Sequence, residues 1–266
     1  MSWKIDKPSK KKQRAITAWS NSRLDVFQTC PHQAELKFID KIPENPRPDT
    51  GKEQANDRGS RVHKAAEDYV LGKTDIIIPE MKSFEAEFLK LRAMREQDEA
   101  SVVCENGWAF DSGWNTVPYD PQDYASWDEF FKTIWARIVI DCLVWLSPAE
   151  VVVIDYKTGK RFGNEIKHGK QMQLYQLATF MRYPEVQLVH PELWYLDQNE
   201  ISPAQSFTRK QGLKFFDDIN RRALEMTNAR WFPANPSKHN CKFCPYQTGE
   251  NKWIVGTGHC DANPQE

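Results

Sequence analysis

The sequence predicts an α/β (or α+β) fold, because β-rich runs alternate along the chain with amphipathic helical segments. The clearest strand is Val151–Lys160, VVVIDYKTGK, in which four apolar β-formers precede three polar residues and a Thr-Gly turn signal. The clearest helix covers residues 80–98, where apolar side chains recur at helical spacing. A chain of 266 residues suits one elaborated domain or two small ones.

The composition limits the classes of function. Apolar residues make up 40% of the chain, and no apolar run is long enough to predict a membrane span. The formal net charge is −1, so a polyanion would have to bind a local basic patch. The N-terminus lacks the apolar core of a signal peptide, so we expect an intracellular, cytoplasmic setting. There the six cysteines are thiols or metal ligands rather than disulfides.

Residues 1–18 are polar and basic, which predicts a flexible tail. This tail is either a solvated, disordered segment or an arm that contacts phosphates. Order is expected from Trp19, so residues 19–266 form a single folded domain. The first helix should have Ser20 or Ser22 as its N-cap and should break or restart at Pro31.

A second helix is predicted over residues 54–71. Gly59, His63 and Glu67 are spaced four residues apart and therefore share one face of it. The glycine would let another backbone approach closely. A lone helical histidine is more often a core or surface residue than a ligand, but the combination with a glycine and a glutamate is less ordinary.

Beyond the helix at 80–98, a strand is predicted over residues 100–110. Residues 114–130 are rich in aspartate, proline and aromatic side chains and read as an inserted loop. Its aromatic residues could stack on unpaired bases or form an aromatic core or interface patch, which is the more common case.

The β-rich run at residues 132–146 and the strand at 151–157 predict a hairpin. With a three-residue turn, Asp141 lies opposite Asp155. Two like charges that face each other in a buried hairpin are unfavourable. A divalent cation between them removes that cost and adds oxygen ligands, so the hairpin predicts a metal site.

Asp155 and Lys157 share one face of the strand, because side chains alternate along it. Taken alone, this pair is equally well explained as a structural ion pair at a strand end. Next along the chain is a predicted helix over residues 166–181, on which Gln171 and Tyr175 are one turn apart. A strand over 186–196 and a long helix over 207–229 complete the fold.

The C-terminal region contains a Cys-x2-Cys pair followed by proline, which predicts a metal knuckle in a reducing compartment. The candidate ligands are Cys30, Cys241, Cys244 and Cys260. His239 and His259 flank the C-terminal cysteines and keep a zinc site open as an alternative.

These motifs together resemble the PD-(D/E)XK nuclease superfamily, in particular its RecB-like branch of CRISPR-associated and phage-type exonucleases. In chain order they are Gly59-x-x-x-His63, Asp141, Asp155-Tyr-Lys157-Thr-Gly, Gln171-x-x-x-Tyr175 and the one-plus-three plan of cysteines. The resemblance spans about residues 20–260 and rests on order and spacing, since each motif alone is weak. Two features depart from the family: Ile138 replaces a frequent glycine, and the gap between Cys244 and Cys260 is longer than usual.

The resemblance implies a restriction-endonuclease-like core, which is a central mixed β-sheet flanked by helices with the site at one edge. The implied ligands of a catalytic Mg²⁺ or Mn²⁺ are His63, Asp141, Asp155 and the carbonyl of Tyr156. The implied catalytic set adds Lys157, Gln171 and Tyr175, with Glu67 orienting His63. The four cysteines would hold a [4Fe–4S] cluster, or structural Zn²⁺, that joins the N- and C-terminal segments.

The expected activity is metal-dependent hydrolysis of DNA phosphodiester bonds, with an exonuclease acting on single- or double-stranded ends. A phage-encoded member would act in the host cytoplasm. The sequence leaves open whether the chain binds a protein partner or forms a homo-oligomer. The first rival is a catalytically inactive DNA-binding or assembly subunit with the same fold and a structural metal. Motif completeness argues against it. The second rival is a zinc-stapled interaction domain without catalysis.

Overall fold

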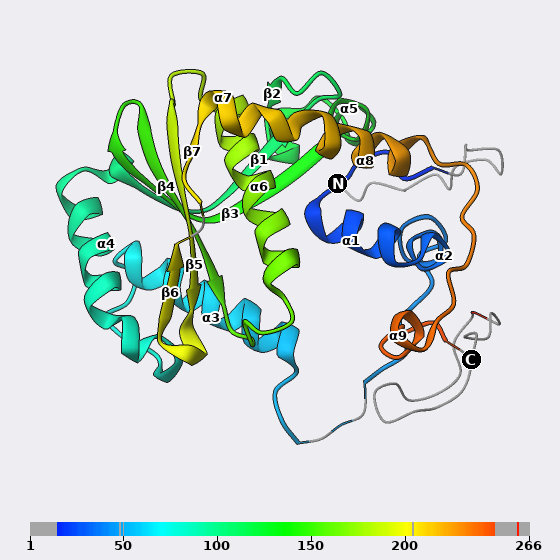
Figure 1. Cartoon of the computed structure of the whole chain (residues 1–266), viewed down its shortest axis with the longest axis horizontal. Helices are drawn as coiled ribbons and strands as arrows, with labels where there is room; N and C mark the ends of the chain where they lie inside the picture. Colours follow the sequence, from blue (N-terminus) through cyan, green and yellow to red (C-terminus); the bar gives the residue numbers. More distant parts are fainter. Residues whose placement is uncertain (1–14, 48, 50, 204, 248–259, 261–266) are drawn as a thin grey trace, which may run out of the picture. The chain divides into compact units, whose positions relative to one another are not determined.

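The computed structural model describes residues 15–47, 49, 51–203, 205–247 and 260 (Figure 1). Contacts divide the chain into two compact units, Met1–Pro48 with Arg222–Glu266 and Asp49–Arg221. The predicted tail at residues 1–18 lies mostly outside the described residues, and Ile16 near its end is buried. None of the helices described here is long and apolar enough to cross a membrane.

The Asp49–Arg221 unit is built on a seven-stranded sheet of order β2-β1-β3-β4-β5-β6, in which β7 also pairs with β5. Only the β4–β5 pair is parallel, so the sheet is mixed, as expected. The strands are β1 Val102–Phe110, β2 Thr116–Val117, β3 Ala136–Ser147, β4 Glu150–Lys157, β5 Leu188–Tyr195, β6 Glu200–Pro203 and β7 Phe207–Thr208.

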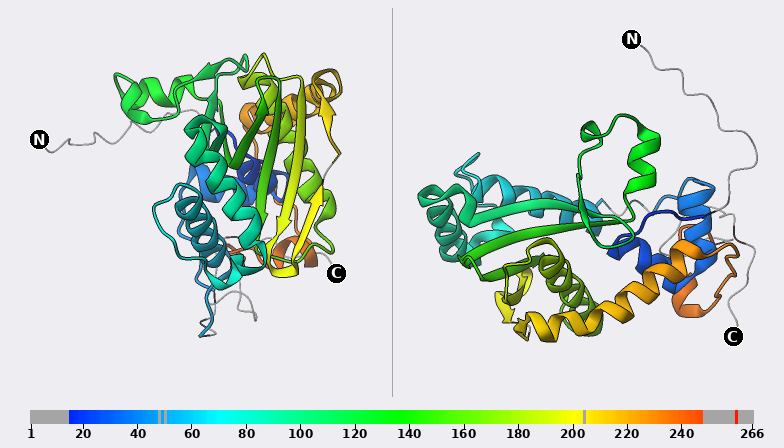
Figure 2. Two further views of the ribbon diagram at one scale, coloured as in Figure 1. Left: turned by 90° about the vertical axis from the view of Figure 1, so that its left-hand side faces the viewer. Right: turned by 90° about the horizontal axis from the view of Figure 1, so that it is seen from above.

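Helices cover both faces of this sheet (Figure 2). On one face, α3 (Ala55–Val70) and α4 (Glu85–Gln97) pack against β3, β4 and β5, and this contact forms an apolar core cluster. On the other face lies α6 (Glu165–Arg182), whose inward side buries Leu174, Leu177 and Phe180. The predicted fold class, a mixed β-sheet flanked by helices, is confirmed.

Shorter helical segments complete the unit. They are η2 Pro79–Phe84, η3 Glu99–Ser101, η4 Pro121–Asp123, α5 Trp127–Thr133, η5 Leu196–Gln198, α7 Arg209–Gly212 and η6 Leu213–Phe215, followed by α8 Phe216–Asn228 at the boundary between the units.

The β3–β4 hairpin has the register predicted for Asp141 and Asp155, but it reaches that register differently. The turn is tight, because Ser147 pairs with Glu150, and the register then shifts at Leu146. This bulge restores the pairing that a three-residue turn would have given. Cys142 pairs with Ile154, so Asp141 and Asp155 occupy the next level of the hairpin.

Three predicted elements differ from the structure. The helix expected at 80–98 begins as the 3₁₀ segment η2 and becomes α-helical only at Glu85. The loop expected at 114–130 contains η4 and runs into α5, which Ser126 caps by accepting from the Glu129 N–H. Within that loop Trp114 is buried, and its indole N–H donates to Asn220 Oδ1 at 3.1 Å.

The long helix expected at 207–229 is divided into β7, α7, η6 and α8. Thr208 and Gln211 form a capping box that starts α7. A Cβ at Gly212 would overlap Gln176 and Phe180 of α6, so this glycine permits close packing of the two helices. These contacts are long-range, and the local helical periodicity does not contain them.

The terminal unit contains α1 (Asn21–Thr29), α2 (Pro31–Ala34), the π-helical segment η1 (Glu35–Ile39) and α9 (Lys238–Cys241). Ser20 caps α1 by accepting from the Arg23 N–H, and a new helix starts at Pro31, as predicted. The Tyr246 hydroxyl donates to the Ile42 carbonyl at 3.2 Å, which ties the C-terminal segment to the N-terminal one.

Candidate active site

Two buried aspartates lie on neighbouring strands at the same end of the hairpin. Asp141 on β3 is 6% exposed and Asp155 on β4 is 1% exposed. The Tyr156 N–H donates to Asp141 Oδ2 at 2.8 Å, which fixes that carboxylate. Repulsion between the two carboxylates is therefore built into the fold, as the hairpin argument predicted.

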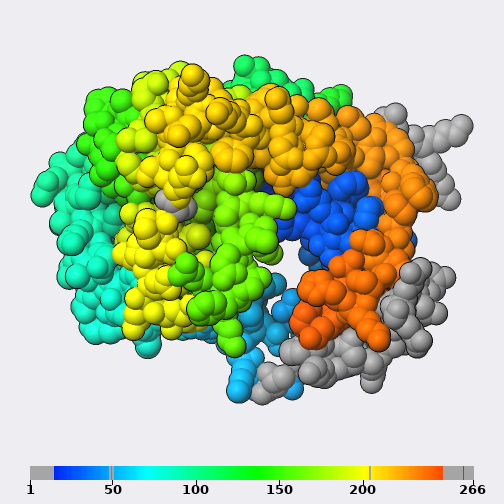
Figure 3. Space-filling model, viewed as in Figure 1, coloured from blue at the N-terminus to red at the C-terminus, as the bar shows by residue number. Residues whose placement is uncertain are grey.

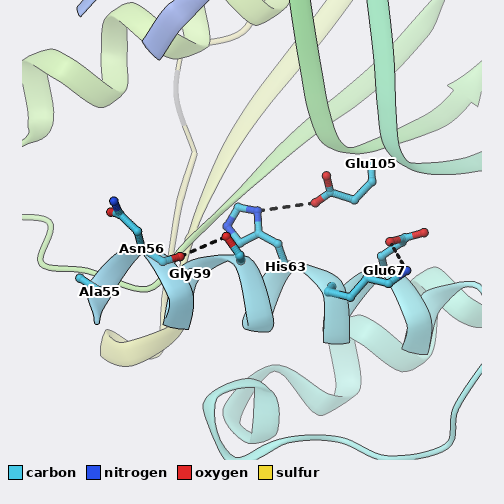
Figure 4. Close-up of a pocket in the computed structure, with 8 residues that line it drawn as sticks. Ala55, Asn56, Gly59, His63, Glu67 and Glu105 are labelled. Atoms are coloured by element: carbon cyan, nitrogen blue, oxygen red, sulfur yellow. Dashed lines mark hydrogen bonds and ion pairs between the residues drawn. The ribbon is translucent and has the colours of Figure 1, made fainter. Parts of the chain in front are cut away.

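His63 reaches these strands from α3 (Figure 4). Its Nε2 lies 2.9 Å from the Tyr156 carbonyl oxygen, while its Nδ1 lies 3.4 Å from Asp141 Oδ2 and 3.6 Å from Glu105 Oε1. Burial disfavours the charged imidazolium, but the Asp141 and Glu105 carboxylates outweigh it and raise the pKa of His63 to about 10. The metal-free ring is therefore charged at neutral pH and donates to the Tyr156 carbonyl.

Glu105 is a member of this site that the sequence reasoning missed. It lies on β1 between the Cys104–Cys142 and Asn106–Ile140 pairs, so it falls opposite Asp141. Its φ of +47° is uncommon for a residue other than glycine. An acidic residue within a strand otherwise rich in apolar side chains was the available signal.

Glu67 does not make the contact that was predicted for it. Its carboxylate accepts from Lys64 Nζ at 2.9 Å and from Lys73 Nζ at 3.2 Å. In the described part of the chain, the carboxylates beside His63 Nδ1 are Glu105 and Asp141. The helical spacing correctly placed Glu67 on the face of His63, but the nearby lysines hold its side chain.

A hydrogen-bonded group between β4 and α6 fixes the lysine. Lys157 Nζ lies 2.6 Å from Asp155 Oδ2 and donates to Gln171 Oε1 at 2.8 Å. Gln171 Nε2 in turn donates to Asp155 Oδ1 at 2.9 Å and to the Tyr175 hydroxyl at 2.7 Å. The shared face predicted for Asp155 and Lys157 is confirmed, and the helix pair on α6 holds both of them.

The ionisation of Asp155 reflects this environment. Burial and the nearby Asp141 charge raise its pKa to about 6, although Lys157 acts in the opposite direction. Ionised Asp155 is thus costly when no further cation is present.

A cavity of about 630 Å³ opens beside His63 (Figure 4). Its wall is one face of α3 from Ala55 to Glu67, together with Glu105. Gly59 lies in this wall, and a Cβ there would meet only Thr158 Oγ1, at 3.7 Å. The expected close approach of another backbone is therefore absent around Gly59 within the described residues, and the missing side chain leaves space in the cavity.

The sequence of residues 18–248 matches the family model of the PD-(D/E)XK nuclease superfamily. The chain belongs to this superfamily. No curated protein sequence matches it. The crystal structure of SSO0001 is similar with a TM-score of 0.37 and 11% identity, covering 90% of this chain and 87% of that one. The crystal structure of a "putative exonuclease" from Eubacterium rectale is similar with a TM-score of 0.43 and 14% identity, covering 90% and 91%.

The donor groups of this PD-(D/E)XK chain fit a divalent cation. His63, Glu105 and Asp141 each bring a ligand atom within 4.8 Å of the others, and the Tyr156 carbonyl oxygen lies 2.9 Å from His63 Nε2. Asp155 is not in this group of three, and its two oxygens contact Lys157 and Gln171. Glu105 Oε1 is buried without a hydrogen-bond partner among the described residues. Oxygen donors of this kind suit Mg²⁺ or Mn²⁺, and an imidazole ligand favours Mn²⁺.

The four cysteines predicted as ligands line one cavity in the terminal unit of this superfamily member. All four are half-buried free thiols. Burial, reinforced by the other three cysteines, raises the pKa of Cys244 to about 11. The Asn235 N–H donates to Cys30 Sγ at 3.4 Å. The four cysteines share this cavity, but among the described residues only His63, Glu105 and Asp141 bring three ligand atoms within 4.8 Å of one another. His239 is exposed, and His259 lies outside the described residues.

Proposed function

We propose that this protein is a metal-dependent deoxyribonuclease that removes nucleotides from DNA ends. The observation that carries the proposal is the convergence of His63 from α3, Asp141 from β3 and the Asp155–Lys157 pair from β4. A cation site beside a fixed ammonium suits phosphodiester hydrolysis, because negative charge grows on the phosphate during the reaction.

Asp141, Asp155, Glu105 and the Tyr156 carbonyl would hold Mg²⁺ or Mn²⁺, with His63 as a nitrogen ligand. When bound, the ion polarises the scissile phosphate and lowers the pKa of a bound water. His63 must lose its proton to serve as a ligand, because its ring is charged in the metal-free protein.

Lys157 is the residue proposed to act on the phosphate directly. Its side chain is 16% exposed, so it is largely shielded from bulk water but accessible to a bound group. There it would orient the attacking water or stabilise the charge that develops on the phosphate oxygens. Gln171 and Tyr175 are positioning residues, because they hold Lys157 and Asp155 at fixed places.

The test uses linear duplex and single-stranded DNA, labelled separately at the 5′ and 3′ ends, with closed circular DNA as the control. We expect degradation with Mn²⁺ and none with a chelator. Lys157→Ala and Asp155→Ala should abolish it while circular dichroism shows that the fold remains. The label released first gives the polarity.

Three outcomes would redirect the proposal. Equal cleavage of circular and linear DNA would make the protein an endonuclease. Retention of full activity in both variants would remove the proposed site. DNA binding without cleavage of any substrate would instead favour an inactive DNA-binding or assembly subunit.

We also propose that Cys30, Cys241, Cys244 and Cys260 hold a [4Fe–4S] cluster, with Zn²⁺ as the alternative. Their common cavity supports this, since thiolates suit both groups. The bound group would fasten the N-terminal segment to the C-terminal segment of the terminal unit. Anaerobically purified cluster protein should be brown, with iron and sulfide near four per chain. A colourless protein with one zinc would favour the alternative, and neither metal would overturn both.

A further inference from the structure

An exposed apolar pair follows the catalytic lysine in sequence. Phe162, in the segment that joins β4 to α6, is 82% exposed, and Ile166, in the first turn of α6, is 78% exposed. This green to yellow-green part of the chain lies uncovered at the molecular surface (Figure 3). Side chains of this size are normally buried, so their exposure suggests a binding surface.

The backbone presents Phe162 in a defined way. The Asn164 N–H donates to the Arg161 carbonyl at 3.0 Å, and Gly163 between them has a φ of +85°. This is the pattern of a type II turn with Phe162 at its first central position. The side-chain amide of Asn164 donates to the Lys160 carbonyl at 2.9 Å. Arg161 also forms an ion pair with Glu200 of β6. Phe162 is therefore held at the tip of a fastened turn.

The surroundings of this pair are basic. Lys160, Arg161, Lys167 and Lys170 stand between residues 160 and 170, where Glu165 is the one acidic residue. Lys160 and Lys170 are exposed and have no ion-pair partner in the described part of the chain. Glu165 accepts from the Gly163 N–H at 2.8 Å, so its carboxylate stabilises the turn. The combination of a basic rim and an aromatic tip suits a polyanion with exposed rings.

A second exposed aromatic pair has the opposite charge around it. Trp127 and Phe131 of α5 stack on each other with centroids 5.8 Å apart and are 64% and 59% exposed. Their neighbours in sequence are mainly acidic: Asp120, Asp123, Asp128 and Glu129, against Lys132, which is paired with Asp128. These carboxylates would repel a phosphate backbone. The aromatic residues of residues 111–131 are therefore the weaker candidates for base stacking.

We propose that the 160–170 segment binds unpaired DNA, with a base stacked on Phe162 and phosphates at Lys160 and Lys170. The proposal deepens the nuclease function proposed above and rests on it. Bases in a duplex already stack on each other, whereas an unpaired base has a free face for an aromatic ring. The segment therefore gives the protein a preference for single-stranded or frayed ends next to Lys157.

The test measures binding of the full chain to fluorescein-labelled oligothymidylate and to a blunt duplex, without added Mg²⁺ or Mn²⁺. Phe162→Ala should weaken binding of the single strand about tenfold, the size of a single stacking contact, and duplex binding much less. Phe162→Trp should retain the affinity, whereas Phe162→Leu should not. Lys160→Gln and Lys170→Gln should each reduce the salt dependence of binding by about one ion.

Trp127→Ala is the matched control, because it also removes an exposed aromatic ring, and it should leave binding unchanged. The proposal is overturned if Phe162→Ala binds the single strand like the wild type, if it weakens both DNAs equally, or if Trp127→Ala causes the loss. Binding is read without catalysis, so this result is separate from the cleavage test. Cleavage that survives in Lys157→Ala would overturn the nuclease site and leave the binding result standing.

Discussion

Glu105 lies opposite Asp141 on the adjacent strand, and both carboxylates lie within 3.6 Å of the same ring nitrogen of His63. Like charges in this arrangement disfavour each other. The charged ring of His63 offsets part of that cost in the metal-free protein. A divalent cation would take over this role when His63 gives up its proton.

Glu105→Gln should therefore weaken Mn²⁺ binding about tenfold or more, because it removes one negatively charged donor. Isothermal titration calorimetry measures the affinity directly. Glu67→Gln is the control, since Glu67 lines the same cavity but is bound to Lys64 and Lys73. Equal losses in the two variants would show that only the overall charge of the cavity matters.

The affinity for the metal should depend on pH in two stages. Between pH about 6 and about 10, binding displaces one proton from His63, so the affinity rises with pH by about tenfold per unit. Below pH about 6, Asp155 must also lose a proton and the dependence steepens. Calorimetry in buffers of different ionisation enthalpy counts the protons released. A His63→Gln variant that still releases one proton at pH 8 would contradict the assignment.

Gln171→Ala should lower kcat about a hundredfold with little change in KM, because Lys157 and Asp155 lose the amide that fixes their positions. Steady-state kinetics on end-labelled DNA measures both constants. Tyr175→Phe should have a much smaller effect, since Gln171 keeps its other two partners. A rise in KM at constant kcat would mean that Gln171 contacts the substrate instead.

Gly59→Ala should stabilise the fold and impair the enzyme. Alanine in place of a helical glycine raises the free energy of unfolding by about 0.5–1 kcal/mol, and the added methyl group meets no tight contact. The methyl group does enter the cavity beside His63, so KM should rise. Gly169→Ala is the matched control for the gain in stability alone, because a Cβ at this α6 position lies in open space. Thermal unfolding of both variants and the kinetics of Gly59→Ala separate the two effects.

Much of the site was predictable because it depends on local periodicity. The alternation of side chains along β4 gave the shared face of Asp155 and Lys157, and helical spacing gave the pairing of Gln171 with Tyr175. The two carboxylates that face each other in the hairpin then indicated a cation between them. These inferences need only the chain segment itself and its nearest turn.

The rest depends on contacts between distant segments. Glu105 joins the site because β1 is the other neighbour of β3 and because its backbone adopts an unusual φ. Glu67 does not contact the site, because its carboxylate is bound to Lys64 and Lys73. The division of the last long helix likewise follows from the packing of Gly212 on α6. Periodicity within one segment carries no information about such partners.

The bulge at Leu146 has a consequence for how the hairpin tolerates changes of length. If Leu146, which is 53% exposed, were deleted, Ser147 would still pair with Glu150 and Trp145 would still pair with Val151. Asp141 would still be level with Asp155. A single deletion between Asp141 and Trp145 would instead turn Asp141 to the opposite face, because side chains alternate. Among natural variants, one-residue gaps are therefore expected at Leu146 and should be absent from the stretch between it and Asp141.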